Sequence, residues 1–358
     1  MDLASADPRL VIVVGSGGVG KTTLAAALGL LSASAGHDSL VMTFDPSRRL
    51  KDTLGVGHAV HDEEVTVTSD TPGRLAASLL DPRHTFDRLV ARYAPDAAAR
   101  ERILGNRYYD HLAGHLGGIL EYMAVERLYE VAKESRHTRI ILDTPPTRQA
   151  LSFLEAPQRV VDFLDSGALR IALKPWFDDA GKLRPTSRLG FVGRGLERYL
   201  DRIVGLELLR DMSEFFRAFE PLFAGFRQRA GEVRQLLAAR DTRFVLVSGP
   251  GSERIPDTLF FARRLQEAGY ALGPVVVNRV HPEFAPPAAT SPPPPQGDVD
   301  GRALFHWLGQ RHRRGLDELR RLLPRERVVA LPLEAGEPTD LASLLAMGRR
   351  LQDLLRRR

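Results

Sequence analysis

Short apolar runs recur along the chain and alternate with segments long enough to form helices. Seven runs rich in aliphatic residues occur at residues 10–14, 40–44, 65–68, 140–142, 244–247, 275–277 and 328–331. Continuous apolar runs of this length are typical of strands buried on both faces, and their alternation with helices is typical of parallel sheets. The pattern predicts an α/β fold with a doubly wound, mainly parallel sheet of about seven or eight strands, covered by helices on both faces.

The section from 150 to 240 lacks a clear strand. We expect it to form an α-helical subdomain inserted in the single domain of residues 1–358. One helical face in it, interrupted by Pro221, carries an apolar stripe formed by Met212, Phe216, Phe219, Phe223 and Phe226. This stripe at 212–226 packs in the core or forms a groove for an apolar client, and its spacing leaves both interpretations open.

Two further segments are expected at the surface. The proline-rich stretch at residues 284–301 predicts an extended surface loop. Residues 341–358 have an amphipathic pattern with a basic end. This pattern favours a helix that covers the sheet over one that contacts anionic lipid.

The amino-acid composition excludes several kinds of chemistry and of binding partner. The chain has 358 residues, 43% of them hydrophobic, which is enough for a large core. It has no cysteine, which excludes disulfides, cysteine nucleophiles and thiolate metal sites. The net charge of +5 comes mainly from arginines interleaved with 45 acids, and nucleic-acid binding is therefore not expected. No apolar run reaches membrane-spanning length and the first residues lack a signal-peptide pattern, so we expect a cytoplasmic protein.

A glycine-rich segment directly follows the first apolar run and leads into a helical one. It consists of Gly15, Ser16, Gly17, Gly18, Val19, Gly20, Lys21, Thr22 and Thr23. Glycines allow backbone N–H groups to surround phosphate oxygens, and the following helix N-terminus adds partial positive charge. In this pattern Lys21 would bind the β- and γ-phosphates and Thr22 would ligate Mg²⁺. The segment therefore predicts a site for a nucleoside triphosphate such as ATP, with Mg²⁺.

The same glycines allow a second interpretation. Gly15, Gly17 and Gly20 also fit the Gly-x-Gly-x-x-Gly pattern of dinucleotide-binding folds, with Asp45 as the ribose-binding acid. A dinucleotide turn has no use for a lysine followed by a metal-binding hydroxyl. The pair Lys21-Thr22 therefore favours the triphosphate.

Two aspartates at the ends of apolar runs complete a site for hydrolysis. Asp143 follows the run at 140–142 and would meet Mg²⁺ directly or through water, while Asp45 would approach the γ-phosphate. Either aspartate alone would fit a turn or a helix cap equally well. Together with Lys21 and Thr22 they favour catalysis.

Three motifs resemble those of one ATPase family. Residues 15–23, 45–50 and 143–147 are similar to the deviant phosphate loop and the two switch segments of the ArsA-type ATPases. That family includes the arsenite-pump ATPase, the targeting ATPase of tail-anchored proteins and bacterial anion-transporting ATPases. The likeness continues at residues 121–124, 276–280 and 330–333.

The resemblance implies a dimer in which ATP binding closes two subunits over facing nucleotide sites. It implies that Asp45 activates the attacking water and that the Mg²⁺ site is served by Thr22, Asp143 and Asp45. It also implies that adenine is contacted by Asn278, Pro332 and Leu333. For Asn278 a buried, loop-stabilising role is the alternative.

The chain departs from the family pattern at three points. Ser16 stands where the family loop usually carries a lysine that reaches the partner's nucleotide. Closure would then depend on an arginine (Arg48, Arg49 or Arg148) or on a paralogous subunit that keeps the lysine, or it would be weakened. Arg148-Gln149 stands where relatives often have Gly-His. Without cysteine, neither arsenite binding nor the bridging zinc site of the tail-anchored targeting ATPases is expected.

These features predict an ATPase whose cycle opens and closes a homodimer, or a heterodimer with a paralogous ATPase, and acts on a hydrophobic client or a membrane partner. The alternative is a ParA- or MinD-like positioning ATPase that acts on DNA or membrane. Salt-dependent binding to DNA or anionic vesicles would distinguish the second from the first.

Overall fold

The structure of the protein is a computed structural model that describes residues 7–44, 49–56, 63–67, 70–105, 119–134, 137–166, 220–286 and 300–357. The chain forms two compact units. Residues 1–81, 129–152 and 235–358 belong to the first unit, and residues 82–128 and 153–234 belong to the second.

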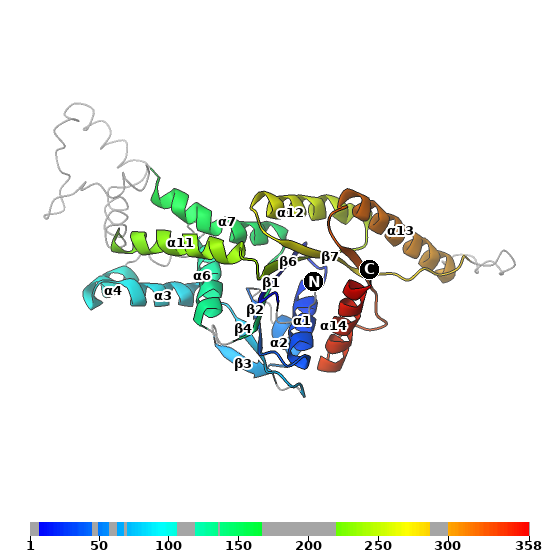
Figure 1. Cartoon of the computed structure of the whole chain (residues 1–358), viewed down its shortest axis with the longest axis horizontal. Coiled ribbons are helices and arrows are strands. Elements are labelled where there is room, and N and C mark those ends of the chain that lie inside the picture. The colour runs from blue at the N-terminus through cyan, green and yellow to red at the C-terminus, as the bar shows by residue number, and fades with distance from the viewer. Residues whose placement is uncertain are drawn as a thin grey trace, which may run out of the picture. The chain divides into compact units, whose positions relative to one another are not determined.

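Within the described residues, the first unit is built on one eight-stranded sheet (Figure 1). In spatial order the strands are β3 (Glu64–Val67), β4 (Leu75–Leu79), β2 (Ser39–Thr43), β5 (Arg139–Asp143), β1 (Leu10–Gly15), β6 (Thr242–Ser248), β7 (Leu272–Val280) and β8 (Val328–Pro332). All neighbours are parallel except β3 and β4. The predicted α/β fold with a doubly wound, mainly parallel sheet is confirmed.

Strand β4 is not among the seven runs that the hydrophobic pattern predicts. Its sequence is Leu75-Ala76-Ala77-Ser78-Leu79, and alanine is depleted in strands and favoured in helices. The strand forms between β2, with which it pairs in parallel, and β3, with which it pairs antiparallel. The pairing partners override the local propensity.

Helices cover both faces of this sheet (Figure 1). Helices α1 (Lys21–Ser34) and α14 (Leu341–Arg356) pack side by side on one face, and α12 (Ile255–Glu267) and α13 (Gly301–Leu322) lie on the other. A Cβ on Gly348 of α14 would lie 2.7 Å from the carbonyl oxygen of Ala27 in α1, so the two backbones approach closely. Leu344 and Leu351 of α14 are buried. The terminal amphipathic segment therefore covers the sheet, as its pattern favours.

The second unit is helical in its described residues. It contains α3 (Pro82–Tyr93), α4 (Ala97–Leu104) and most of α6 (Ile119–Glu134), α7 (Thr147–Leu164) and α11 (Phe223–Leu237), the last preceded by a 3-10 turn at Glu220–Leu222. None of the helices in the described ranges combines the length and the apolar character that crossing a bilayer requires.

Parts of three predictions lie outside the described residues. These parts are residues 167–219 of the helical subdomain expected at 150–240, residues 212–219 of the apolar stripe, and residues 287–299 of the proline-rich segment. Phe223 and Phe226, at the described end of the stripe, are half-buried in α11. All three expectations stay predictions.

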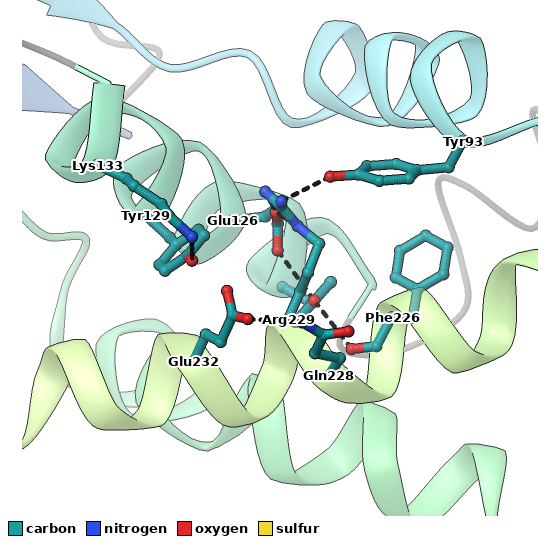
Figure 2. Close-up of polar contacts among 9 residues, drawn as sticks. Tyr93, Glu126, Tyr129, Lys133, Phe226, Gln228, Arg229 and Glu232 are labelled. Atoms are coloured by element: carbon teal, nitrogen blue, oxygen red, sulfur yellow. Dashed lines mark hydrogen bonds and ion pairs between the residues drawn. The ribbon is translucent and has the colours of Figure 1, made fainter.

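A buried ion pair connects helices of the second unit (Figure 2). The Glu126 carboxylate of α6 has no exposed surface and pairs with the guanidinium of Arg229 in α11. Arg229 also donates to the hydroxyl of Tyr93 in α3 over 2.7 Å, and its guanidinium lies 5.4 Å from the centre of that ring. The Tyr122 hydroxyl donates to the same carboxylate over 3.0 Å. Burial, and next the Glu126 charge, raise the pKa of Tyr122 well above its ordinary value.

Candidate functional site

The phosphate loop, residues 15–20, lies at the carboxyl end of β1. β1 ends at Gly15 and α1 begins at Lys21, so the loop leads from a central strand into a helix N-terminus. Gly20 has a left-handed φ of 88°, and a Cβ there would lie 2.5 Å from Nδ2 of Asn278. A Cβ on Gly15 would overlap the carbonyl oxygen of Val247. Glycine is therefore required at both positions, and the helix N-terminus behind them favours an anion.

Lys21 reaches back over this loop. Its Nζ donates a hydrogen bond of 3.0 Å to the backbone oxygen of Ser16, and the residue is only 8% exposed. A cation enclosed by loop backbone at a helix N-terminus is suited to a phosphate group, because both the ammonium and the helix favour negative charge.

Oxygen ligands for a metal ion meet beside the loop. Oγ1 of Thr22 donates to Oδ2 of Asp143 over 2.7 Å, and Oγ1 of Thr43 donates to the same oxygen over 3.0 Å. Asp143 is 1% exposed. Hydroxyl and carboxylate oxygens are the hard ligands that Mg²⁺ prefers, so the donor set fits this ion, and Thr22 and Asp143 would hold it.

Thr43 is a site residue that the sequence analysis misses. It pairs in register with Asp143 where β2 and β5 run side by side, and this brings its hydroxyl to the carboxylate. Its one signal in the sequence is a polar residue in the last position of an apolar strand, two residues before Asp45.

The segment after β5 is held against β1 and the loop. Thr144 donates to the carbonyl oxygen of Val13 through both its hydroxyl, over 2.8 Å, and its backbone N–H, over 3.2 Å. A Cβ on Gly17 of the loop would lie 3.8 Å from Cβ of Pro146. The predicted second switch therefore lies beside the phosphate loop.

Asn278 contacts the phosphate loop from the end of β7. Its Nδ2 donates to the backbone oxygen of Val19 over 2.8 Å, its Oδ1 accepts from the backbone N–H of Arg279 over 2.9 Å, and it is 5% exposed. This contact corresponds to the loop-stabilising role, which is the alternative to contacting adenine. Leu333 donates its backbone N–H to Val280 over 2.9 Å, and its side chain is exposed. Pro332 lines a separate pocket against α14.

Several expected site residues lie outside the described part of the chain. Asp45 and Arg48 belong to the gap at residues 45–48, and the side chains of Arg49 and Arg148 are likewise not described. The roles expected for these residues stay predictions.

Comparison with known proteins gives one family and several relatives. The sequence matches the family described as anion-transporting ATPase over residues 8–187, which is half of the chain and includes the phosphate loop, Thr43 and Asp143. It is 29% identical over 279 residues to an uncharacterised protein of Streptomyces coelicolor, covering 78% of this chain and 64% of that protein. It is 31% identical over 179 residues to the ATPase GET3C of Arabidopsis thaliana, covering 46% and 44% of the two chains. It is 30% identical over 152 residues to the ATPase get3 of Aspergillus terreus, covering 42% and 43%.

The aligned region spans less than two thirds of the length of each of these relatives. The family match nevertheless covers the fold elements that form the site, from β1 through the phosphate loop to β5 and the segment after it. The chain therefore belongs to the family of anion-transporting ATPases, the ArsA type.

Proposed function

We propose that the chain binds Mg-ATP at the phosphate loop and hydrolyses its terminal phosphoanhydride bond. The observation that carries this proposal is the 2.7 Å hydrogen bond between Thr22 and Asp143, beside a glycine loop that encloses the Lys21 ammonium. A hydroxyl, a carboxylate and a cation in one site are the groups that a Mg-triphosphate needs. Membership of an ATPase family supports ATP as the nucleotide.

Each residue of the site has a role in this proposal. Mg²⁺, when bound, would neutralise part of the charge on the β- and γ-phosphate oxygens. Thr22 and Asp143 would hold the metal, and the hydrogen bond from Thr43 keeps the Asp143 carboxylate oriented. Lys21 would stabilise the charge that develops on the γ-phosphate. Asp45 would orient the attacking water, accept its proton and contribute to the metal site.

Adenine would lie near the end of β7. Asn278 still has one N–H and one lone pair beyond its contacts with the loop and Arg279, so its amide can both hold the loop and contact a base edge. The segment Pro332–Leu333 would border the base, since Leu333 is bonded to the end of β7.

ATP binding would close a dimer, formed by two copies of this chain or with a paralogous ATPase. The resemblance to ArsA-type ATPases supports this arrangement. Because Ser16 cannot carry a cation to the partner's nucleotide, that cation would come from Arg48, Arg49 or Arg148, or from a paralogous partner. The cycle would act on a hydrophobic client or a membrane partner.

Phosphate release from Mg-ATP tests the enzyme assignment. Thr22→Val should lower turnover on the order of 100-fold, because the variant loses a metal ligand while keeping the side chain's shape. Thr66→Val, at an exposed position of the edge strand β3, is the matched control and should leave turnover unchanged. Equal turnover in the two variants would contradict the proposal.

Protein concentration tests the dimer. Turnover per molecule should rise with concentration, or on addition of a paralogous ATPase, because a closed dimer completes the site. A constant rate from a monomer, with and without the paralogue, would rule out the dimer.

Asp45→Asn should lower turnover and retain ATP binding, since the carboxylate acts on water rather than on the nucleotide.

A further inference from the structure

A pocket lies beside the phosphate loop in the first unit. It has a volume of about 260 Å³ and is bordered by Gly18 and Val19 of the loop, by residues 249–251, 253 and 254 after β6, by Asn278 and Arg279 at the end of β7, and by His312 of α13. Neither metal-binding candidate lines it. The pocket is therefore distinct from the metal side of the site.

Close packing of α13 brings His312 to this pocket. Gly309, His312 and Gly315 are three residues apart and share one helical face. A Cβ on Gly309 would lie 2.7 Å from the carbonyl oxygen of Pro282, and a Cβ on Gly315 would lie 2.9 Å from that of Pro250. The helix thus touches the segments after β7 and β6 on either side of His312, which holds the imidazole at the pocket.

The imidazole of His312 offers an N–H donor. The backbone N–H of His281 donates to its Nδ1 over 3.1 Å. Burial, and next the charge effects of His281 and Arg311, lower the pKa of His312, which favours the neutral ring. A neutral ring that accepts at Nδ1 carries its proton on Nε2.

Arg254 brings a cation to the same pocket. Its Cγ would lie 3.4 Å from a Cβ on Gly249, so its stem packs along the segment after β6. The other charges of the lining are paired: Arg279 with Glu337 at 3.0 Å, and Glu253 with Arg311 at 3.1 Å. The Arg254 guanidinium makes no hydrogen bond or ion pair with any residue that the structure describes. It is therefore the cation available to a ligand.

We infer that this pocket holds the nucleoside half of the bound nucleotide, and that Arg254 and His312 contact it directly. The inference rests on the proposed function and adds two residues to it. The phosphates would lie in the loop at the end of β1, and Thr22, Thr43 and Asp143 occupy the side of the loop toward β5. The nucleoside would therefore extend to the other side, over the ends of β6 and β7, where the pocket lies.

The chemistry of the lining fits this occupant. A guanidinium stacks on the face of a purine and donates to ribose oxygens, and an imidazole N–H donates to an acceptor on either. Pockets for whole drug-sized ligands have volumes of roughly 300–1,000 Å³, so about 260 Å³ suits half a nucleotide. Of the three residues that the family resemblance implies for adenine, only Asn278 lines the pocket.

Comparison of two ligands tests the inference on the full chain. Calorimetry measures the Kd of Mg-ATP and of Mg-bound inorganic triphosphate, which has the phosphates and lacks the nucleoside. Arg254→Ala and His312→Ala should each weaken Mg-ATP binding about tenfold and leave triphosphate binding within about twofold, since each removes one contact to the nucleoside. Arg263→Ala, at an exposed position of α12, and His306→Ala, six residues before His312 in α13, are the controls and should change neither.

The results distinguish a failure of this inference from a failure of the proposed function. If wild type binds both ligands and Arg254→Ala and His312→Ala bind Mg-ATP normally, the inference is overturned and the proposed function stands. Equal weakening of both ligands also overturns it, because the residues would then act on the loop or the phosphates. If wild type binds neither ligand, the proposed function falls and this assignment falls with it.

Discussion

Replacing Arg229 by methionine should destabilise the protein strongly, because the change removes the guanidinium that pairs with the buried Glu126 carboxylate. Arg229 gives this fully buried carboxylate a hydrogen bond from Nε–H and a full positive charge. After the substitution, of the hydrogen bonds described above, Glu126 keeps only the one from Tyr122. Hydrogen bonds to charged groups contribute roughly 1.5–3 kcal/mol each, and breaking a buried ion pair costs about 3–5 kcal/mol. We expect a loss of about 3–5 kcal/mol in the free energy of unfolding.

A neighbouring ion pair supplies the matched control. Arg227 lies two residues earlier in α11 and pairs with Asp165 over 2.5 Å, with both side chains at least half exposed. Arg227→Met should cost no more than about 1 kcal/mol, because solvent screens the pair. The double variant Glu126→Leu/Arg229→Met should recover most of the loss of Arg229→Met, since it removes the buried charge.

Urea unfolding, monitored by circular dichroism, measures these differences as shifts of the urea midpoint, provided that the free energy of unfolding falls with urea concentration at the same slope in each variant. Equal midpoints for Arg229→Met and Arg227→Met would refute the argument.

Three further predictions follow from single contacts. Because the pKa of Tyr122 is raised in the folded protein, its stabilising contribution is constant below about pH 10 and is lost above it. Tyr122→Phe should reduce the alkaline fall of the urea midpoint, and an unchanged fall would contradict this. Gly348→Ala should cost about 1–3 kcal/mol by overpacking against Ala27, whereas Gly336→Ala, with nothing within 4 Å of the added Cβ, should melt like wild type. Asn278→Asp removes the donor to the phosphate loop and the amide beside the base, so it should weaken inorganic triphosphate about tenfold in calorimetry and Mg-ATP by at least as much; unchanged binding of both ligands would contradict this.

The elements that could be predicted from the sequence are those with a strong local signal. The buried strands are continuous apolar runs, and the phosphate loop combines glycines that the backbone requires with Lys21 and Thr22. Strand β4 could not be predicted in this way, because its alanine-rich sequence favours a helix and only the pairing with β2 and β3 makes it a strand.

The contacts that could not be predicted depend on residues far apart in the chain. Thr43 reaches Asp143 only through the register of β2 and β5, across 100 positions. Glu126 and Arg229 meet across 103 positions, and each taken alone fits a solvated helix surface. The pocket beside the phosphate loop likewise forms only because α13 packs closely through Gly309 and Gly315. No local sequence pattern predicts this packing.

Calorimetric titration of the full chain with ATP, in Mg²⁺ and in EDTA, tests the central claim most directly. The account predicts that wild type binds ATP at least about tenfold more tightly with Mg²⁺, and that Asp143→Asn loses this metal dependence, because the carboxylate bonded to Thr22 holds the ion. An absence of ATP binding, or an Asp143→Asn variant with the metal dependence of wild type, would contradict it.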